Sequence, residues 1–124
     1  MKYVILIHSN PQPWGHPTTD FIPEYKALPE EKKKQLAADF DKLLEELQSN
    51  GEWVTAAALA DPASSTLYRR PAGEQVVTDG PYSEAKEHFA GFFMIDVESR
   101  ERAEQIASRF GGPTETIELR PVAE

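Results

Sequence analysis

The chain contains 124 residues, of which 40% are hydrophobic, so we expect one folded domain over residues 1–124 and not a disordered chain. Its 13 Lys and Arg residues stand against 21 Asp and Glu residues, and the formal net charge of −8 excludes nucleic acid as an expected partner, because phosphate would be repelled. The absence of cysteine excludes disulfides, thiolate nucleophiles and sulfur ligands for a metal.

The first element in chain order is a predicted strand over residues 2–8, which is apolar at nearly every position. Such a run is typical of a strand that is covered on both faces, and it is too short to span a membrane. No cleavage site of small residues follows it, so we expect a cytoplasmic protein without membrane contact. Residues 9–28 are polar and rich in proline, and a connection of this length predicts a lid or binding loop.

The middle of the chain predicts a helix followed by three strands. Residues 29–48 carry leucine and phenylalanine at helical spacing, which predicts a helix with one apolar face. Residues 52–59 predict a second strand, which ends at an Asp-Pro pair. Residues 66–70 and 74–78 are short β-rich runs on either side of Pro-Ala-Gly, and this arrangement predicts an inserted β-hairpin.

The last third of the chain predicts a turn, a strand, a helix and a closing strand. Residues 79–87 have turn chemistry followed by helix formers, which indicates a tight turn and about one helical turn. Residues 88–97 predict a strand that is apolar on both faces, with Phe89 and Phe93 on the same face. A second helix is predicted next, with Ser99 as its N-cap. Residues 116–122 alternate apolar and polar side chains, as a strand at the sheet margin does.

This order of elements predicts the α+β class and a ferredoxin-like fold of the dimeric α/β barrel type, with an antiparallel sheet, two helices on one face and an inserted β-hairpin. Two helices cover only one face, although the strands at 2–8 and 88–97 are apolar on both faces. We therefore expect a homodimer that buries the helix-free sheet face. We also expect these two strands to run parallel, which would place His8 near Asp96 and His88 at the opposite end.

Two stretches of the sequence match the signature of a known family. Residues 77–87 (Val-Thr-Asp-Gly-Pro-Tyr-Ser-Glu-Ala-Lys-Glu) and 90–97 (Ala-Gly-Phe-Phe-Met-Ile-Asp-Val) resemble the YCII-related (DGPF) family, and the opening and closing strands are also similar to it. The resemblance implies a ferredoxin-like, dimeric fold and a lyase-like or isomerase-like activity on small organic acids. The positions that carry the family residues are Asp79, Gly80, Pro81, Glu84, Lys86, Glu87 and Gly91, whereas Tyr82 replaces the usual phenylalanine.

The family resemblance also implies a His–Asp pair whose histidine lies in the helix that corresponds to residues 29–48. This sequence has no histidine in that stretch. The pair is therefore not transferred to this chain, and its catalytic candidates have to come from other positions.

The Asp79-Gly80-Pro81 segment supplies the first catalytic candidate. Asp79 is placed to act as a base or as an anchor for a ligand, or it only caps the turn that follows. Gly80 permits a close approach of the backbone, and Pro81 fixes the chain beyond it. We expect both to contact a ligand. The further predicted ligand-binding residues here are Tyr82, Glu84 and Lys86, although charged side chains at such positions also serve as solvated surface groups.

His8 is the second catalytic candidate, because imidazole exchanges protons near neutral pH. It ends the first strand directly before the proline-rich loop, in which Trp14 and His16 are predicted to bind a ligand at the mouth of a pocket. The alternative is a strand-end histidine that is bonded to the backbone. His8, His16 and Asp20 do not have a recognised spacing of metal ligands, so we expect neither a metal site nor a cofactor.

Two classes of function remain open from the sequence. The first is a cofactor-free acid–base enzyme that acts on a small organic molecule. The second is a non-catalytic, small-molecule-binding or accessory dimer. A concave apolar pocket around Asp79 or a histidine favours the enzyme, whereas fully paired motif residues on a shallow surface favour the accessory role.

Overall fold

The computed structural model describes residues 1–82 and 85–124. Its main sheet has four strands in the order β2-β5-β1-β6, and every neighbouring pair is antiparallel. These strands are β1 (Lys2–Ser9), β2 (Trp53–Ala58), β5 (His88–Asp96) and β6 (Thr116–Pro121). The predicted α+β class with an antiparallel sheet is confirmed, and this topology is compatible with a ferredoxin-like fold.

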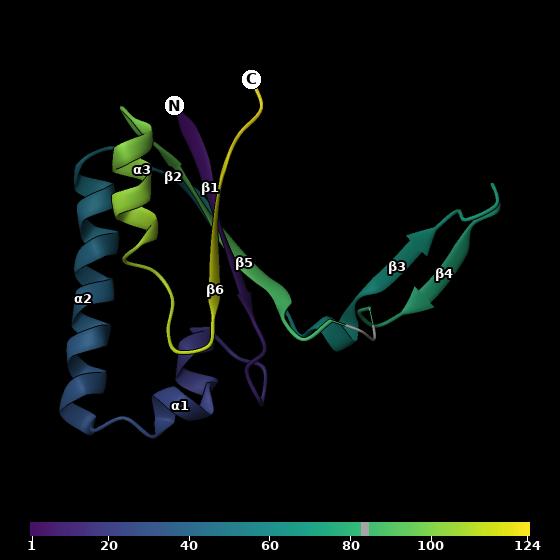
Figure 1. Ribbon diagram of the computed structural model, residues 1–124, viewed down its shortest axis with the longest axis horizontal. Coiled ribbons are helices and arrows are strands. Elements are labelled where there is room, and N and C mark those ends of the chain that lie inside the picture. The colour runs from purple at the N-terminus through teal and green to yellow at the C-terminus, as the bar shows by residue number, and fades with distance from the viewer. Residues whose placement is uncertain (83–84) are drawn as a thin grey trace.

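Two helices, α2 (Glu30–Ser49) and α3 (Arg100–Ala107), cover one face of this sheet (Figure 1). The N-terminus of α3 is capped by Ser99, whose hydroxyl oxygen accepts a hydrogen bond from the backbone N–H of Arg102 at 3.1 Å. No helix in the described part of the chain is long and apolar enough to cross a membrane.

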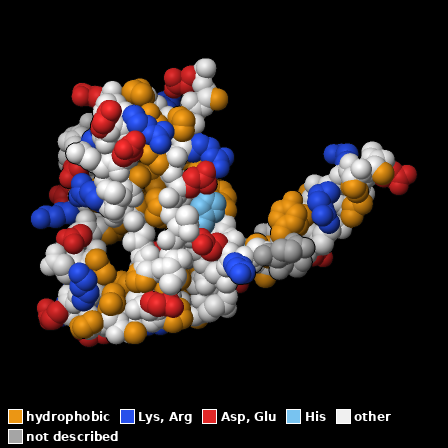
Figure 2. Space-filling view, viewed as in Figure 1, with side chains coloured by type: hydrophobic (Ala, Val, Ile, Leu, Met, Phe, Trp, Pro, Cys, Tyr) orange, Lys and Arg blue, Asp and Glu red, His pale blue; other side chains and the backbone are white. Residues whose placement is uncertain are grey.

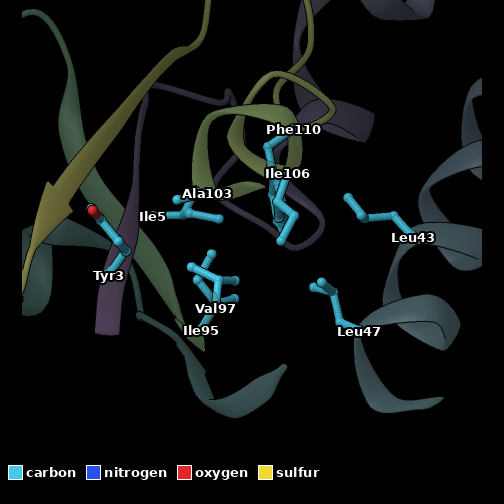
Figure 3. Close-up of a cluster of buried hydrophobic side chains, with 9 residues drawn as sticks. All are labelled: Tyr3, Ile5, Leu43, Leu47, Ile95, Val97, Ala103, Ile106 and Phe110. Carbon is cyan, nitrogen blue, oxygen red and sulfur yellow. The ribbon is translucent and has the colours of Figure 1, made fainter. Parts of the chain in front are cut away.

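The hydrophobic core lies between these helices and the sheet, and Figure 3 shows side chains from both layers pointing toward one another. Ile5 of β1 and Ile95 of β5 are fully buried, as are Leu43 of α2 and Ile106 of α3. Leu47 lies one turn after Leu43 and is also fully buried, which explains why the helical spacing of leucines predicts this helix. The face of the sheet that the helices cover therefore carries the hydrophobic core.

The central strand pair has the opposite relative direction to the one expected. β1 and β5 are antiparallel, with Lys2 opposite Asp96 and Ser9 opposite His88. The expectation of a parallel pair was wrong, because β5 returns between the two strands that are linked by the α2 crossover and so runs against both of them. His8 and His88 consequently lie at the same end of the sheet, and Asp96 lies at the other end.

A β-bulge near the start of β5 decides on which face Phe89 lies. The register shifts between Ile7 and His8, and His8 pairs with Phe89. The ring of Phe89 stacks on the ring of Phe92 with centroids 6.5 Å apart. The expectation that Phe89 and Phe93 share a face was wrong, because the extra residue of the bulge moves the alternation of side chains by one position.

The sheet face opposite the helices is called the helix-free face here, and β1 and β5 contribute five apolar side chains to it: Val4, Leu6, Phe89, Phe92 and Met94. Val4 pairs with Met94 and Leu6 with Phe92, so these residues alternate along their strands with the core residues. Phe89 is exposed and the other four are half-buried. No helix among the described residues covers this face (Figure 1).

The long connection between β1 and α2 contains short helices and is fastened to the body of the protein. A 3-10 helix, η1 (Thr18–Phe21), and α1 (Pro23–Lys26) occupy much of the stretch that we expected to be a lid or binding loop. The hydroxyls of Thr18 and Thr19 donate hydrogen bonds to the carboxylate of Glu115 at 2.5 and 2.7 Å. This connection is therefore tied to the segment that precedes β6.

The inserted strands form an arm, defined here as residues 66–79. β3 (Thr66–Arg69) and β4 (Val76–Asp79) pair with each other as an antiparallel, two-stranded sheet. Figure 1 shows the arm extending away from the main sheet on the side opposite α2 and α3, and Figure 2 shows it standing clear of the body. A 3-10 helix, η2 (Pro62–Ser64), lies at its base, between β2 and β3.

Candidate functional site

A cleft of about 200 Å³ lies at the base of the arm, beside the first residue of β5. Its walls come from segments far apart in the sequence, namely the residues after β1, the start of η2 and the chain that returns from the arm. The lining residues are Asn10, Pro11, Gln12, Trp14, Asp61, Pro62, Ala63, Pro81 and His88. Apolar rings with a few convergent polar groups are typical of a site for a small molecule.

His88 brings an imidazole into the wall of this cleft. It is the first residue of β5 and pairs with Ser9, the last residue of β1, so the sheet fixes its backbone. The antiparallel pairing of β1 and β5 places it beside the loop that leaves β1. A half-buried imidazole at the edge of a cleft can accept a proton from a bound molecule and return it, because each ring nitrogen can either bind or donate a proton.

Asp61 adds a carboxylate to the same cleft, and two side-chain amides lie in its wall. One oxygen of Asp61 accepts a hydrogen bond from the backbone N–H of Ala63 at 2.9 Å, which caps the start of η2. The side-chain amide of Gln12 donates to the side-chain oxygen of Asn10 at 3.1 Å. Carboxylate and amide groups each have several donor or acceptor positions, so these contacts leave capacity for a polar ligand.

Trp14 and His16 converge on one backbone carbonyl. The indole N–H of Trp14 donates to the Leu59 oxygen at 2.9 Å, and Nε2 of His16 lies 2.7 Å from the same oxygen. Because a carbonyl oxygen only accepts hydrogen bonds, Nε2 of His16 carries the proton in this arrangement. Trp14 lines the cleft, whereas His16 is not among the lining residues and braces the loop against the segment after β2.

His8, the histidine predicted to be catalytic, lies on the helix-free face and is not among the residues that line the cleft. Its Nε2 is 2.9 Å from a carboxylate oxygen of Glu118, and its ring centroid is 6.1 Å from that of Phe89. Hydrogen bonds from His8 and then from Arg120 hold the pKa of the Glu118 carboxyl below its ordinary value. His8 thus has a carboxylate as its partner, in place of the backbone group considered from the sequence.

The Asp-Gly-Pro segment reaches the cleft through Pro81. Asp79 ends β4 opposite Thr66; it is exposed and is not among the lining residues. The backbone N–H of Gly80 donates to the Ser65 carbonyl at 2.6 Å, which closes the base of the arm. The two predicted catalytic residues therefore lie on different parts of the structure, Asp79 at the base of the arm and His8 on the helix-free face.

Tyr82 and Lys86, two further predicted ligand-binding residues, are not among the residues that line the cleft. The guanidinium of Arg69 lies over the ring of Tyr82, 6.0 Å from its centroid, and Lys86 is exposed. Glu84 lies outside the described residues. Glu87 accepts a hydrogen bond from the hydroxyl of Thr116 at 3.0 Å, in agreement with a surface role for this side chain.

His88 and Asp61 are the titratable lining residues, and sequence reasoning missed both, as it missed the amides of Asn10 and Gln12. Both stand at the ends of predicted strands next to turns, which is a weak signal of a functional position. Only the register of the sheet and the path of the arm show that they share one cleft. Within the described ranges, 1–82 and 85–124, there is no group of three or more His, Asp or Glu side chains placed to hold a metal ion.

Gly80 is the position in the motif where a side chain should cost most stability. Its φ of +84° lies in the left-handed region, although the space beside it is open. We expect Gly80→Val to lower the free energy of unfolding by about 1–2 kcal/mol, because a β-branched residue is strained there. Glu87→Ala removes one exposed hydrogen bond and should change stability by less than about 0.5 kcal/mol. Equal urea midpoints for the two variants would contradict this account of the turn.

Comparison with known proteins gives a family match over the whole chain. A family model described as the YCII-related domain matches residues 1–124. A protein of Rhizobium meliloti (strain 1021), named uncharacterized protein R00369, is 30% identical to this chain over 100 residues, which cover 78% of this chain and 81% of that protein. The name of this relative assigns neither a reaction nor a ligand.

Proposed function

This chain belongs to the YCII-related domain family, and we propose that it is a cofactor-free acid–base enzyme that acts on a small organic molecule bound in the cleft at the base of the arm. His88 is the group that transfers protons. The position of this imidazole carries the proposal, because it lies in a cleft wall together with a carboxylate and two amides. Such groups can orient a ligand while the imidazole removes and returns a proton.

The dimensions of the cleft favour a compact substrate. Its volume of about 200 Å³ is below the roughly 300–1,000 Å³ of sites for drug-sized ligands. The amides of Asn10 and Gln12 offer donors for a carboxylate or carbonyl oxygen, and the ring of Trp14 offers an apolar surface. A small carbonyl compound or organic acid fits this chemistry, and proton removal beside a carbonyl is a common step of lyase-type and isomerase-type reactions.

Asp79 enters the proposal as an anchor at the rim of the cleft. One residue separates it from Pro81, which lines the cleft. Its carboxylate has no hydrogen-bond or ion-pair partner among the described residues, so it can accept a hydrogen bond from a hydroxyl or amine of the ligand.

The test follows proton exchange, because this step is detectable before the complete reaction has been identified. A panel of small keto acids, hydroxy acids and other carbonyl compounds is incubated with the protein in D₂O, and the loss of C–H signals is followed by ¹H NMR. We expect the protein to exchange or convert at least one compound. We expect His88→Gln to slow that reaction by about 100-fold or more, since general acid–base groups typically contribute 10²–10⁴-fold.

His8→Gln is the matched control for this assay, because His8 lies at the same end of the sheet but outside the cleft lining. It should leave the exchange rate unchanged, while Asp79→Asn should raise KM more than it lowers kcat. An exchange rate that His88→Gln leaves at the wild-type value contradicts the proposed role of His88.

A second candidate function is a non-catalytic small-molecule-binding or accessory protein. The observation that favours it is that several polar groups around the cleft already have protein partners, namely the Asp61 carboxylate and the ring nitrogens of Trp14 and His16. In that case the panel should contain compounds that bind and raise the melting temperature, but none whose protons exchange.

We also propose that the protein is a homodimer that buries the helix-free face. Support comes from the five apolar side chains of that face and from the absence of a covering helix among the described residues. A second copy stacked on this face would remove these side chains from water.

A further inference from the structure

The arm has little of its own to hold it in one shape. β3 and β4 pair only with each other among the described strands. An isolated two-stranded hairpin is at best marginally stable in water, and it needs a further surface to pack on. The arm therefore needs a surface to pack on, and the described body of the same chain does not provide one. Figure 2 shows the arm standing apart from that body.

Exposed apolar side chains gather on the arm and at its base. Tyr68 and Val77 are directly opposite each other on one face of the hairpin, and they are 64% and 52% exposed. Val76 and Tyr82 are also exposed. Figure 2 shows hydrophobic side chains along the arm. Large apolar groups clustered in this way indicate a contact surface.

The arm and the helix-free face lie on the same side of the main sheet. Figure 1 shows the helices on one side and the arm extending on the other. A second copy that stacks on the helix-free face would therefore lie beside the arm. The geometry favours a second copy of this chain as the occupant, because the arm projects toward the space that such a copy would fill.

Charge does not oppose this association. The charged residues of the arm are two arginines and two acidic residues, Arg69, Arg70, Glu74 and Asp79. On the helix-free face, Glu118 is paired with His8 and Arg120, and Asp96 at its edge is paired with the N-terminal amine at 2.9 Å. The acidic excess behind the net charge of −8 therefore lies outside these two surfaces. Two copies can bring them together without like-charge repulsion.

The area required by a stable dimer also argues for a role of the arm. An ordinary interface buries about 800 Å² on each partner. Of the five apolar side chains that β1 and β5 place on the helix-free face, only Phe89 is exposed, at 42%, and the other four are half-buried. Tyr68 of the arm and Tyr82 at its base are both exposed. An aromatic residue has about 150–250 Å² of surface, so together they expose on the order of 200 Å² to water. The arm thus adds apolar area that the helix-free face lacks.

We propose that the arm of each copy packs against a second copy of this chain, with Tyr68 and Val77 seated on the body of the partner. This inference rests on the proposed homodimer. The contact has a consequence for the cleft, because Asp61 and Pro81 lie just before and just after the arm in the chain and line the cleft at its base. Locking the arm onto the partner fixes these residues, so the cleft reaches its working shape only in the dimer.

The first test measures the dimer dissociation constant by sedimentation velocity. We expect the double variant Tyr68→Ser, Val77→Ser to raise this constant about tenfold or more, since contact aromatics often dominate an interface. Ala38→Ser changes an exposed side chain of α2, outside the arm and the helix-free face, and should leave the constant within about twofold. Circular dichroism that matches the wild type shows that each variant is folded.

The second test locates the contact directly. The chain has no cysteine, so Arg70→Cys, two residues after Tyr68 in the arm, gives a single attachment point for a benzophenone cross-linker and leaves Tyr68 and Val77 in place. Equal amounts of ¹⁴N-labelled and ¹⁵N-labelled protein are mixed and irradiated, and mass spectrometry identifies the joined peptides. We expect mixed-isotope cross-links between the arm and the body, and none from the control Gln35→Cys on the outer surface of α2.

The outcomes separate this inference from the proposed activity. A dimer whose dissociation constant is unchanged in the double variant, or cross-links confined to one chain, overturns the role of the arm. A wild-type protein that stays monomeric at tens of micromolar overturns both the dimer and the arm, but it leaves the exchange activity of the cleft to be judged by His88→Gln. Intermolecular cross-links from a protein without exchange activity support the arm and count against the enzyme.

Discussion

Replacing Ile95 by alanine is expected to lower the free energy of unfolding by about 2–5 kcal/mol, as large-to-small substitutions in a packed core do. Ile95 is fully buried near the end of β5 and belongs to the same cluster as Ile5 and Leu43 (Figure 3). Truncation removes burial of the side chain and leaves a cavity between the sheet and α2. Urea unfolding followed by circular dichroism measures the change.

Val54→Ala is the matched control, because it also shortens a β-branched apolar side chain in a strand of the main sheet. Val54 is exposed, so its truncation should change the free energy of unfolding by less than about 0.5 kcal/mol. If Ile95→Ala lowered the free energy of unfolding by no more than Val54→Ala does, the helix-covered face of the sheet would not be the principal core.

Gly91→Ala is expected to lower the free energy of unfolding by about 1–3 kcal/mol, because overpacking forces the backbone to move. A Cβ at this position would lie 2.6 Å from the carbonyl oxygen of Ala57, a backbone atom of β2 that a side-chain rotation cannot relieve. The variant should push β2 away from β5. Hydrogen exchange should therefore show reduced protection of the β2 amides, in addition to a lower urea midpoint.

The control for Gly91→Ala is Gly73→Ala in the arm, where the space beside the glycine is open but φ is +86°. This control carries backbone strain without a collision. Gly73→Ala is expected to lower the free energy of unfolding through this strain, but the hydrogen-exchange protection of the β2 amides should stay at the wild-type value. If Gly91→Ala also left β2 protection unchanged, the close approach of β2 and β5 would not explain this glycine.

Most helices and strands could be predicted because their side-chain patterns are local. The leucines of α2 recur at helical spacing, and the bounds found, Glu30–Ser49, differ from the predicted residues 29–48 by one position. Ser99 was recognisable as a cap because its side chain satisfies a backbone N–H at the start of α3. The apolar composition of β1 and β5 likewise predicts central strands.

The arrangement of strands and the bulge could not be derived from local patterns. The relative direction of β1 and β5 depends on where the chain returns in the sheet, and the sequence reasoning assigned it wrongly. The bulge that moves Phe89 to the helix-free face is visible only in the register between two strands. The short helices η1 and α1 lie in a proline-rich stretch in which periodicity gives no signal.

The candidate site was predicted only in part, for the same reason. Trp14 and Pro81 were predicted and line the cleft, whereas His88 and Asp61 were not assigned to it. The wrong strand direction placed His88 away from the end of β1, and this removed it from consideration. Asp79 and His8 were chosen for their chemistry, and the exchange assay tests both choices with Asp79→Asn and His8→Gln.

The central claim is that the cleft beside His88 is the working site, and NMR of the histidine side chains tests it most directly. The chain has only three histidines, so each imidazole gives a separate signal that can be assigned with a single variant. We expect a compound that binds from the small-acid panel to shift the signals of the His88 imidazole and the Trp14 indole, and to leave His8 unchanged. Shifts at His8 and the other residues of the helix-free face, with none at His88, would contradict the account.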